Sequence, residues 1–138
     1  MKYFPQFDSS DCGAACLTMV AAAYGSRWSL AHVRDIAGTD RRGTNLNGML
    51  IAAEALGFES KAMKSEEKLI DPSIPLPCIA HIERTDSSNH LVVIYKTKGS
   101  KLWIADSNIA KAKFTVDLSE FSKEWSGNAV FFIPHTGF

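Results

Sequence analysis

The sequence has few cysteines, and none of them has the spacing of a metal or redox site. There are three cysteines, which is an odd number and too few for a disulfide framework: Cys12, Cys16 and Cys78. Cys12 and Cys16 lie four residues apart without a CxxC or HxxxH partner, which argues against a structural zinc site. A glycine-rich phosphate loop is also missing. We therefore expect reduced thiols, no metal and no cofactor in this chain.

Long apolar runs and an excess of one charge are missing as well. No stretch approaches the roughly 20 apolar residues that span a bilayer. The start, MKYFPQFDSSD, lacks the continuous apolar core of a signal peptide. The 15 basic and 15 acidic side chains cancel, and no run of Lys or Arg would concentrate phosphates. We therefore expect a cytosolic chain that does not bind nucleic acid.

The composition is that of a globular domain, with 46% hydrophobic and 22% charged residues. A chain of 138 residues can bury roughly 68% of its unfolded surface without disulfide or metal cross-links. We expect a single domain over residues 1–138.

The first half of this domain, about residues 1–57, predicts three helices. Cys12 to Tyr24 is rich in Ala, has apolar residues at helical spacing and is followed by Gly25, which suits a left-handed C-cap. Two further segments have a capping residue in front and a glycine behind. The first is SLAHVRDIAG, with Ser29 as its cap and Gly38 behind it. The second is NLNGMLIAAEALG, with Thr44 or Asn45 as its cap and Gly57 behind it.

The second half, about residues 58–138, predicts an antiparallel sheet. Five runs rich in Val, Ile, Trp and Phe read as strands: PCIAHIE, HLVVIYKT, KLWIADS, AKFTV and AVFFIP. The links Thr85 to Asn89 and Lys98 to Ser100 are too short for crossover helices. LSEFSKEW predicts a small helix among the strands, and the proline-rich DPSIPLP predicts an extended connection between the halves. The fold class is therefore α+β, in two packed layers.

Cys12 lies where the turn formers DSSD meet the first turn of a helix. Unpaired backbone N–H groups and the positive helix end lower the pKa of a thiol there, and Gly13 lets the backbone approach a substrate. The neighbouring Asp8 and Asp11 disfavour a thiolate, so a reactive Cys12 needs a cationic partner. The alternative is that Cys12 is a small core residue, as we expect for Cys16 one turn later.

The candidates for that partner are four histidines. His32 and His135 are in polar surroundings typical of the surface. His81 lies within a predicted strand, and the alternation of that strand fits a side chain on either face of the sheet. His90 begins HLVVIY directly after the polar turn DSSN, which places an imidazole at the mouth of a buried strand. A structural or solvent-facing His90 is the alternative.

Asp106 is the natural group to orient that imidazole, since nucleophile, base and orienting group act as a set. It ends the strand KLWIAD. If this strand pairs with HLVVIY through the turn at Lys98 to Ser100, then His90 and Asp106 lie near the same end of the hairpin. By itself Asp106 could equally be a turn former before Ser107.

Three segments together resemble the double-glycine leader peptidases. QFDSSDCGAACLTM resembles the nucleophile segment of that family, NHLVVIY its histidine segment and WIADS its aspartate segment. These peptidases process bacteriocin precursors as the N-terminal domain of peptidase-containing ABC transporters. The order and separation of the three segments agree with that family over nearly the whole chain. Ser107 stands where the family usually has proline.

The resemblance implies a papain-like cysteine peptidase fold and a Cys-His-Asp triad. Cys12 would be the nucleophile, His90 the general base and then acid, Asp106 the orienting group and Gln6 a donor to the oxyanion. The implied substrate is a precursor peptide cut after Gly-Gly or Gly-Ala at the end of its leader. The implied partners are the membrane-spanning and ATP-binding domains of a transporter, on the cytoplasmic side of the cell membrane, with any ATP bound by that separate domain.

Two other functions fit the same residues. One is a leader-docking module that does not cut, against which the presence of Cys12 argues. The other is a papain-fold acyl transferase, in which the Cys12 thioester passes to an amine other than water.

Overall fold

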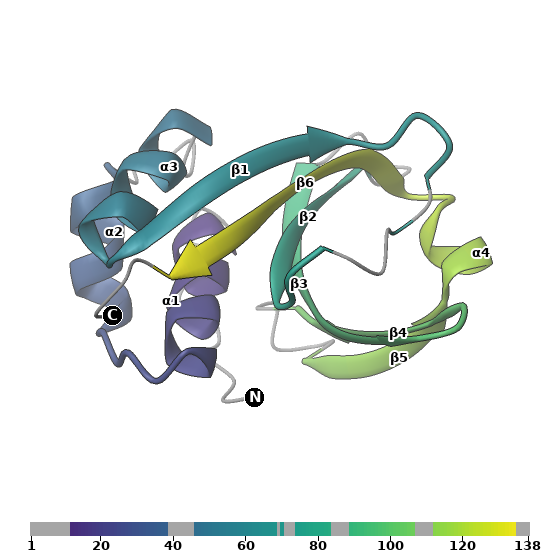
Figure 1. The fold of residues 1–138 in the computed structure, drawn as a ribbon, viewed down its shortest axis with the longest axis horizontal. Coiled ribbons are helices and arrows are strands. Elements are labelled where there is room, and N and C mark those ends of the chain that lie inside the picture. Colours follow the sequence, from purple (N-terminus) through teal and green to yellow (C-terminus); the bar gives the residue numbers. More distant parts are fainter. Residues whose placement is uncertain are drawn as a thin grey trace.

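Three helices come first, and a six-stranded antiparallel sheet follows them (Figure 1). The structure is a computed structural model that describes residues 12–38, 46–68, 70, 74–83, 89–106 and 112–134, apart from the side chains of Cys12, Leu46, Asn47 and Asn89. Its elements are α1 (Cys12–Ala23), α2 (Leu30–Ala37), α3 (Leu46–Ala55), β1 (Phe58–Lys64), β2 (Cys78–Glu83), β3 (Asn89–Lys98), β4 (Lys101–Ala105), β5 (Lys113–Asp117), α4 (Leu118–Phe121) and β6 (Trp125–Pro134). The predicted division into a helical half and a sheet half is confirmed.

The predicted helix signals are confirmed where the structure describes them. Ser29 caps α2, because its Oγ accepts the backbone N–H of His32 at 3.1 Å. Gly38 ends α2 in the left-handed conformation, with φ of 68°. The expected caps of α3, Thr44 and Asn45, lie outside the described residues.

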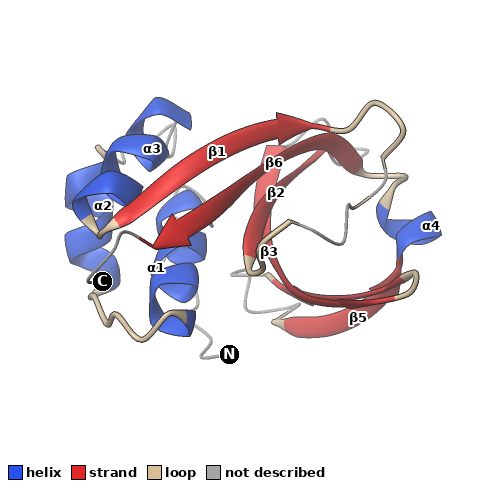
Figure 2. Cartoon of the chain, viewed as in Figure 1, coloured by secondary structure: helices blue, strands red, loops and turns tan. Residues whose placement is uncertain are grey.

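The strand order in the sheet is β1-β6-β2-β3-β4-β5, with antiparallel neighbours throughout (Figure 2). Five of these strands were predicted, and β1 was missed. Its sequence, FESKAMK, has a buried Phe58 but exposes Glu59, Lys61 and Lys64. Such polar residues suit an edge strand, which β1 is, and they hide the apolar signal of a strand.

The predicted helix LSEFSKEW is only partly correct. The helix α4 ends at Phe121, and Trp125 already belongs to β6. Trp125 is buried, pairs with Ile82 of β2 and donates its indole N–H to the carbonyl of Asn128 at 2.9 Å. Burial of this large ring in the sheet overrides the helical pattern. The described part of the proline-rich connection, residues 74–77, contains neither helix nor strand, as expected.

Two apolar clusters lie on opposite faces of the sheet. The first packs the helices α1, α2 and α3 against the sheet, and the second lies on the concave side, with α4 at its edge (Figure 2). In β3, Val93 belongs to the first cluster, whereas Val92 and Ile94 belong to the second. This alternation is the period of two that a strand buried on both faces requires. In the part of the chain that the structure describes, no helix has both the length and the apolar character to cross a membrane.

Gly127 provides a test of the β6 geometry. Its φ is +90°, and a Cβ built on it would lie 2.5 Å from the Ser65 carbonyl oxygen. The backbone is held there, because Ser65 N–H donates to the Gly127 carbonyl at 2.8 Å. We expect Gly127→Ala to lower the free energy of unfolding by about 2–3 kcal/mol in chemical denaturation. The matched control is Gly38→Ala, which has φ of +68° but open space around the new Cβ and should cost about 1 kcal/mol. Equal losses would contradict the contact.

Cys78 provides a test of the second cluster. Burial raises the pKa of its thiol to about 12. At about pH 8 roughly one molecule in ten thousand would then carry the thiolate, which is the form that reacts with alkylating agents. We expect iodoacetamide to leave Cys78 unmodified in the native protein and to modify it after denaturation, as read from peptide masses. Rapid modification under native conditions would show that this cluster opens.

Candidate active site

Most of the helix α1 is enclosed by the rest of the fold. Residues 13–20 are all buried, and α1 lies between the sheet and the helices α2 and α3 (Figure 1). Its small residues Ala14, Ala15 and Ala21 allow this close approach, and Thr18 satisfies its hydroxyl by donating to the Ala14 carbonyl at 2.8 Å. Cys12 occupies the first turn of α1, where the N–H groups of a helix have no partner within the helix.

A hydrogen bond fixes α1 to the beginning of β3. The Cys16 thiol donates to the Leu91 carbonyl at 3.3 Å, across 75 residues of sequence. Cys16 lies one helical turn, about 6 Å along the axis, beyond Cys12, and Leu91 directly follows His90. Cys16 was predicted to be a packing residue, and its complete burial confirms this. The sequence carries no signal for its bond to Leu91.

The hairpin of β3 and β4 brings the predicted histidine and aspartate together. The strands pair from Lys98 opposite Lys101 to Val93 opposite Ala105, and β2 pairs with the start of β3, with Ile82 opposite His90. The hairpin is not a simple one, because its register shifts at a bulge between Ile94 and Lys96. Beyond the bulge, Asp106 follows Ala105 and therefore stands opposite Val92. That position is the diagonal neighbour of His90 on the same face of the sheet.

The side chains of His90 and Asp106 form a short, buried hydrogen bond. The distance between His90 Nε2 and Asp106 Oδ1 is 2.6 Å, and the residues are 8% and 1% exposed. An ionised carboxylate only accepts hydrogen bonds, so this contact assigns the ring hydrogen to Nε2. The second ring nitrogen, Nδ1, is directed away from Asp106. The hairpin and the contact that the sequence predicted are therefore present.

The backbone of Asp106 is held independently of its side chain. Its N–H donates to the carbonyl of Ala112 at 2.8 Å, just before β5 begins. The backbone of Asp106 is thus held between β4 and β5, and the backbone of His90 is held by the pairing of β3 with β2. A buried carboxylate and a buried imidazole are costly to desolvate, and their mutual bond compensates part of that cost.

The other histidines occupy ordinary environments. His32 is exposed and stacks on Trp28 with 4.9 Å between ring centroids, as a surface residue does. His81 is half-buried, and its Nδ1 lies 2.9 Å from Ser126 Oγ, whose hydroxyl in turn donates to the His81 carbonyl. His135 lies outside the described residues. Within the described ranges, no three His, Cys, Asp or Glu side chains are grouped as metal ligands.

Some of the predicted site residues lie outside the part of the chain that the structure describes. Gln6, Ser107 and the side chain of Cys12 are among them, so their roles stay predictions. Gly13 is described and is buried in the first turn of α1, and its proposed closeness to substrate also stays a prediction. The described geometry supplies a buried imidazole with an assigned tautomer, on a strand that is hydrogen-bonded to α1 through Cys16 and Leu91. Such a group can accept a proton from a thiol and return it to a leaving group.

The sequence matches the Peptidase C39 family over residues 1–137. The lactococcin-G-processing and transport ATP-binding protein LagD of Lactococcus lactis subsp. lactis is 43% identical over 131 residues, which are 94% of this chain and 18% of LagD. The transport/processing ATP-binding protein ComA of Streptococcus pneumoniae is 35% identical over 133 residues, which are 96% of this chain and 18% of ComA. The chain therefore spans less than a fifth of the length of these curated relatives.

Solved structures agree with these relatives. The peptidase domain of Streptococcus ComA superposes with a TM-score of 0.89 at 33% identity, over 97% of this chain and 98% of that one. A double glycine motif protease from an AMS/PCAT transporter, solved in complex with the leader peptide, gives 0.85 at 31% identity, over 96% of this chain and 91% of that one. The expected α+β, papain-like fold is confirmed. The chain belongs to the Peptidase C39 family of cysteine peptidases.

Proposed function

We propose that this chain is a peptidase domain, over residues 1–138, that removes the leader from a secreted peptide precursor after Gly-Gly or Gly-Ala. The observation that carries the proposal is the buried 2.6 Å bond between His90 and Asp106, in a hairpin whose strand β3 is hydrogen-bonded to α1 through Cys16. The relatives support it, because LagD and ComA are processing and transport proteins and one similar protease binds a leader peptide. The domain would act on the cytoplasmic side of a membrane, attached to the membrane-spanning and ATP-binding domains of an ABC transporter.

In the proposed mechanism the His90 tautomer sets the direction of proton flow. With hydrogen on Nε2, the lone pair of the neutral ring is on Nδ1, which takes the proton of the Cys12 thiol. The resulting imidazolium is stabilised by the carboxylate of Asp106. Cys12 then reacts as a thiolate, assisted by the N-terminal end of α1.

The thiolate of Cys12 adds to the carbonyl carbon after the second small residue of the leader. The Gln6 amide and the Cys12 backbone N–H would hold the oxyanion, each such donor contributing about 2.7–4 kcal/mol to transition-state stabilisation. His90 gives its proton to the departing amine as the peptide bond breaks, leaving a thioester. His90 then takes a proton from water, the hydroxide adds to the thioester, and Cys12 leaves as a thiolate.

Specificity for two small residues follows from exclusion of side chains. Gly13 is buried directly after Cys12, so a substrate backbone would have to approach the helix end closely. A narrow passage there rejects longer side chains at the last two leader positions.

The nucleophile is tested with a synthetic leader that ends in Gly-Gly and continues for a few residues, with products read by mass under reducing conditions. We expect the parent chain to cut after the second glycine and Cys12→Ala to bind the leader without cutting it. The matched control is Cys78→Ala, which removes a thiol from the second cluster and should still cut. Leader binding without cleavage by the parent chain would favour a docking module. Amide products formed with added amines would favour a transferase.

The role of Asp106 is tested by its variants. Asp106→Ala removes the acceptor for His90 Nε2, so we expect kcat/KM to fall by about 100-fold or more. Asp106→Asn keeps an amide oxygen that can accept this hydrogen bond and should retain more activity than Asp106→Ala. In both variants the alkaline limb of the pH–rate profile should move to lower pH, because the imidazolium loses its anionic neighbour. An unchanged profile would show that Asp106 supports only the fold.

A further inference from the structure

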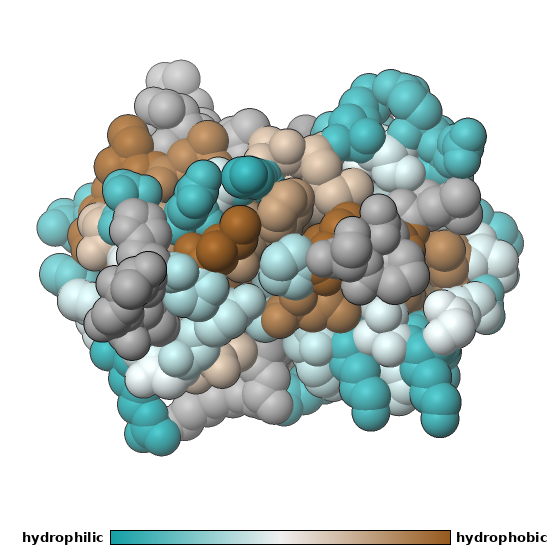
Figure 3. Space-filling view, in the orientation of Figure 1, coloured by the Kyte–Doolittle hydropathy of each residue, from teal (hydrophilic) through white to brown (hydrophobic). Residues whose placement is uncertain are grey.

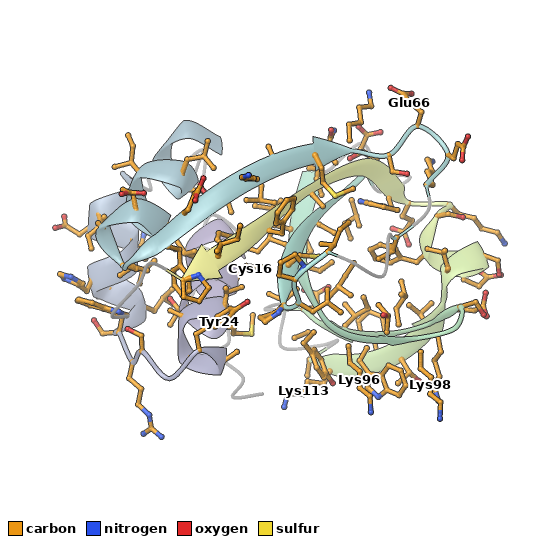
Figure 4. The ribbon with its side chains drawn as sticks, viewed as in Figure 1. Cys16, Tyr24, Glu66, Lys96, Lys98 and Lys113 are labelled. Atoms are coloured by element: carbon orange, nitrogen blue, oxygen red, sulfur yellow. The ribbon has the colours of Figure 1, made fainter. Side chains whose placement is uncertain are left out.

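The outer surface of β3, β4 and β5 carries a cluster of lysines around two aromatic rings. We name this cluster the lysine face, and it consists of Lys96, Lys98, Lys101 and Lys113 with Tyr95 and Trp103. Figure 4 shows Lys96, Lys98 and Lys113 pointing away from the sheet in the same direction, below β4 and β5. The corresponding lower right edge of the molecule in Figure 3 ends in hydrophilic side chains. The four lysines are all exposed.

The bulge in β3 creates this face. Ile94 stands opposite Ile104, and Lys96 opposite Trp103, so Tyr95 and Lys96 together oppose one residue of β4. Without the extra residue, alternation would direct Lys96 to the side of Ile94, which is buried in the second cluster. Tyr95 is partly buried and packs against the first cluster.

The ammonium groups are arranged around the rings. Lys96 Nζ lies 4.7 Å and Lys101 Nζ 5.1 Å from the centre of the Trp103 ring, and Lys113 Nζ lies 5.9 Å from that of Tyr95. These are cation–π distances. Among the described residues, Lys96, Lys98 and Lys101 make no ion pair with a carboxylate.

The one acidic side chain that the described strands direct to this face is already engaged. Asp117 stands opposite Lys101, but its carboxylate accepts hydrogen bonds from the Ser100 hydroxyl at 2.8 Å and from the backbone N–H and hydroxyl of Ser119. Four lysines against this one carboxylate leave the described part of the lysine face with a net positive charge, in a chain whose formal net charge is zero.

We propose that the lysine face rests on the anionic phospholipid headgroups of the membrane beside which this domain works. Lysines near a negatively charged lipid surface are attracted to it, and Trp is the side chain that favours the boundary between water and lipid. The described part of the face has no Arg, the side chain that suits paired recognition of a fixed phosphate, as in nucleic acid. Compact ammonium charges on a sheet surface instead match a fluid layer of headgroups.

This placement has a consequence for the catalytic pair. His90 precedes Lys96 by six residues on β3, which corresponds to about 20 Å along the strand. With the lysine face on the headgroups, β3 would run along the membrane, and His90, on the opposite face of the sheet from Trp103, would be directed away from the lipid. The inference rests on the proposed function only for the presence of a membrane.

The test is sedimentation of the whole chain with vesicles made of phosphatidylglycerol and phosphatidylcholine, or of phosphatidylcholine alone. We expect binding only to the anionic vesicles, half-complete near about millimolar accessible anionic lipid, and weakened by added salt. The variant Lys96→Gln/Lys98→Gln/Lys101→Gln should bind on the order of 100-fold more weakly, since each lysine contributes about fivefold.

The matched control is Lys61→Gln/Lys64→Gln/Lys123→Gln, which removes the same charge from exposed positions on β1 and after α4. It should bind within about twofold of the parent, because its lysines lie outside the face. Equal loss in both triple variants, or equal binding of the parent to both kinds of vesicle, would overturn the proposal. The latter result would show that the charge of the lysines does not drive the binding. Leader cleavage in solution is measured separately and should be the same in the parent and both variants, so a failure of the peptidase proposal leaves the vesicle result interpretable.

Discussion

The burial of α1 over residues 13–21 is the constraint on which the rest of the arrangement depends. A helix without a polar face needs cover on every side, which the sheet and the helices α2 and α3 provide. Its buried polar groups have to be satisfied within the protein, and Thr18 and Cys16 do so through the carbonyls of Ala14 and Leu91. The first turn of α1, with Cys12, therefore cannot shift without disturbing the start of β3.

The two halves of the fold contribute different parts of the site. The helical half supplies a cysteine at a helix end, and the sheet half supplies a histidine and an aspartate already bonded to each other. The pair is held by backbone pairing with β2 and by the bond from Asp106 to Ala112 near β5. In the proposed peptidase such a pair would be preorganised, because the imidazole would need no reorientation when the Cys12 thiol gives up its proton.

Much of this could be predicted from the sequence because the signals are local. Ser29 and Gly38 mark the limits of α2, and the short turn after Lys98 fixes the partners of the hairpin. The strand β1 was missed because its polar residues belong to an exposed edge, and the length of α4 was missed because burial of Trp125 is a tertiary effect. The lysine face could not be predicted either. Its members are scattered along the sequence and share a surface only after three strands pair.

The bulge in β3 has a further consequence for the position of Asp106 relative to His90. Counted from the pairing of Lys98 with Lys101, a hairpin without the extra residue would set Asp106 opposite Val93, whose side chain is directed toward α1. The carboxylate would then lie on the opposite face of the sheet from His90. A single additional residue thus decides whether the two side chains can meet. An insertion or deletion of one residue in this hairpin would therefore separate the two side chains, whereas a substitution that preserves the register would not.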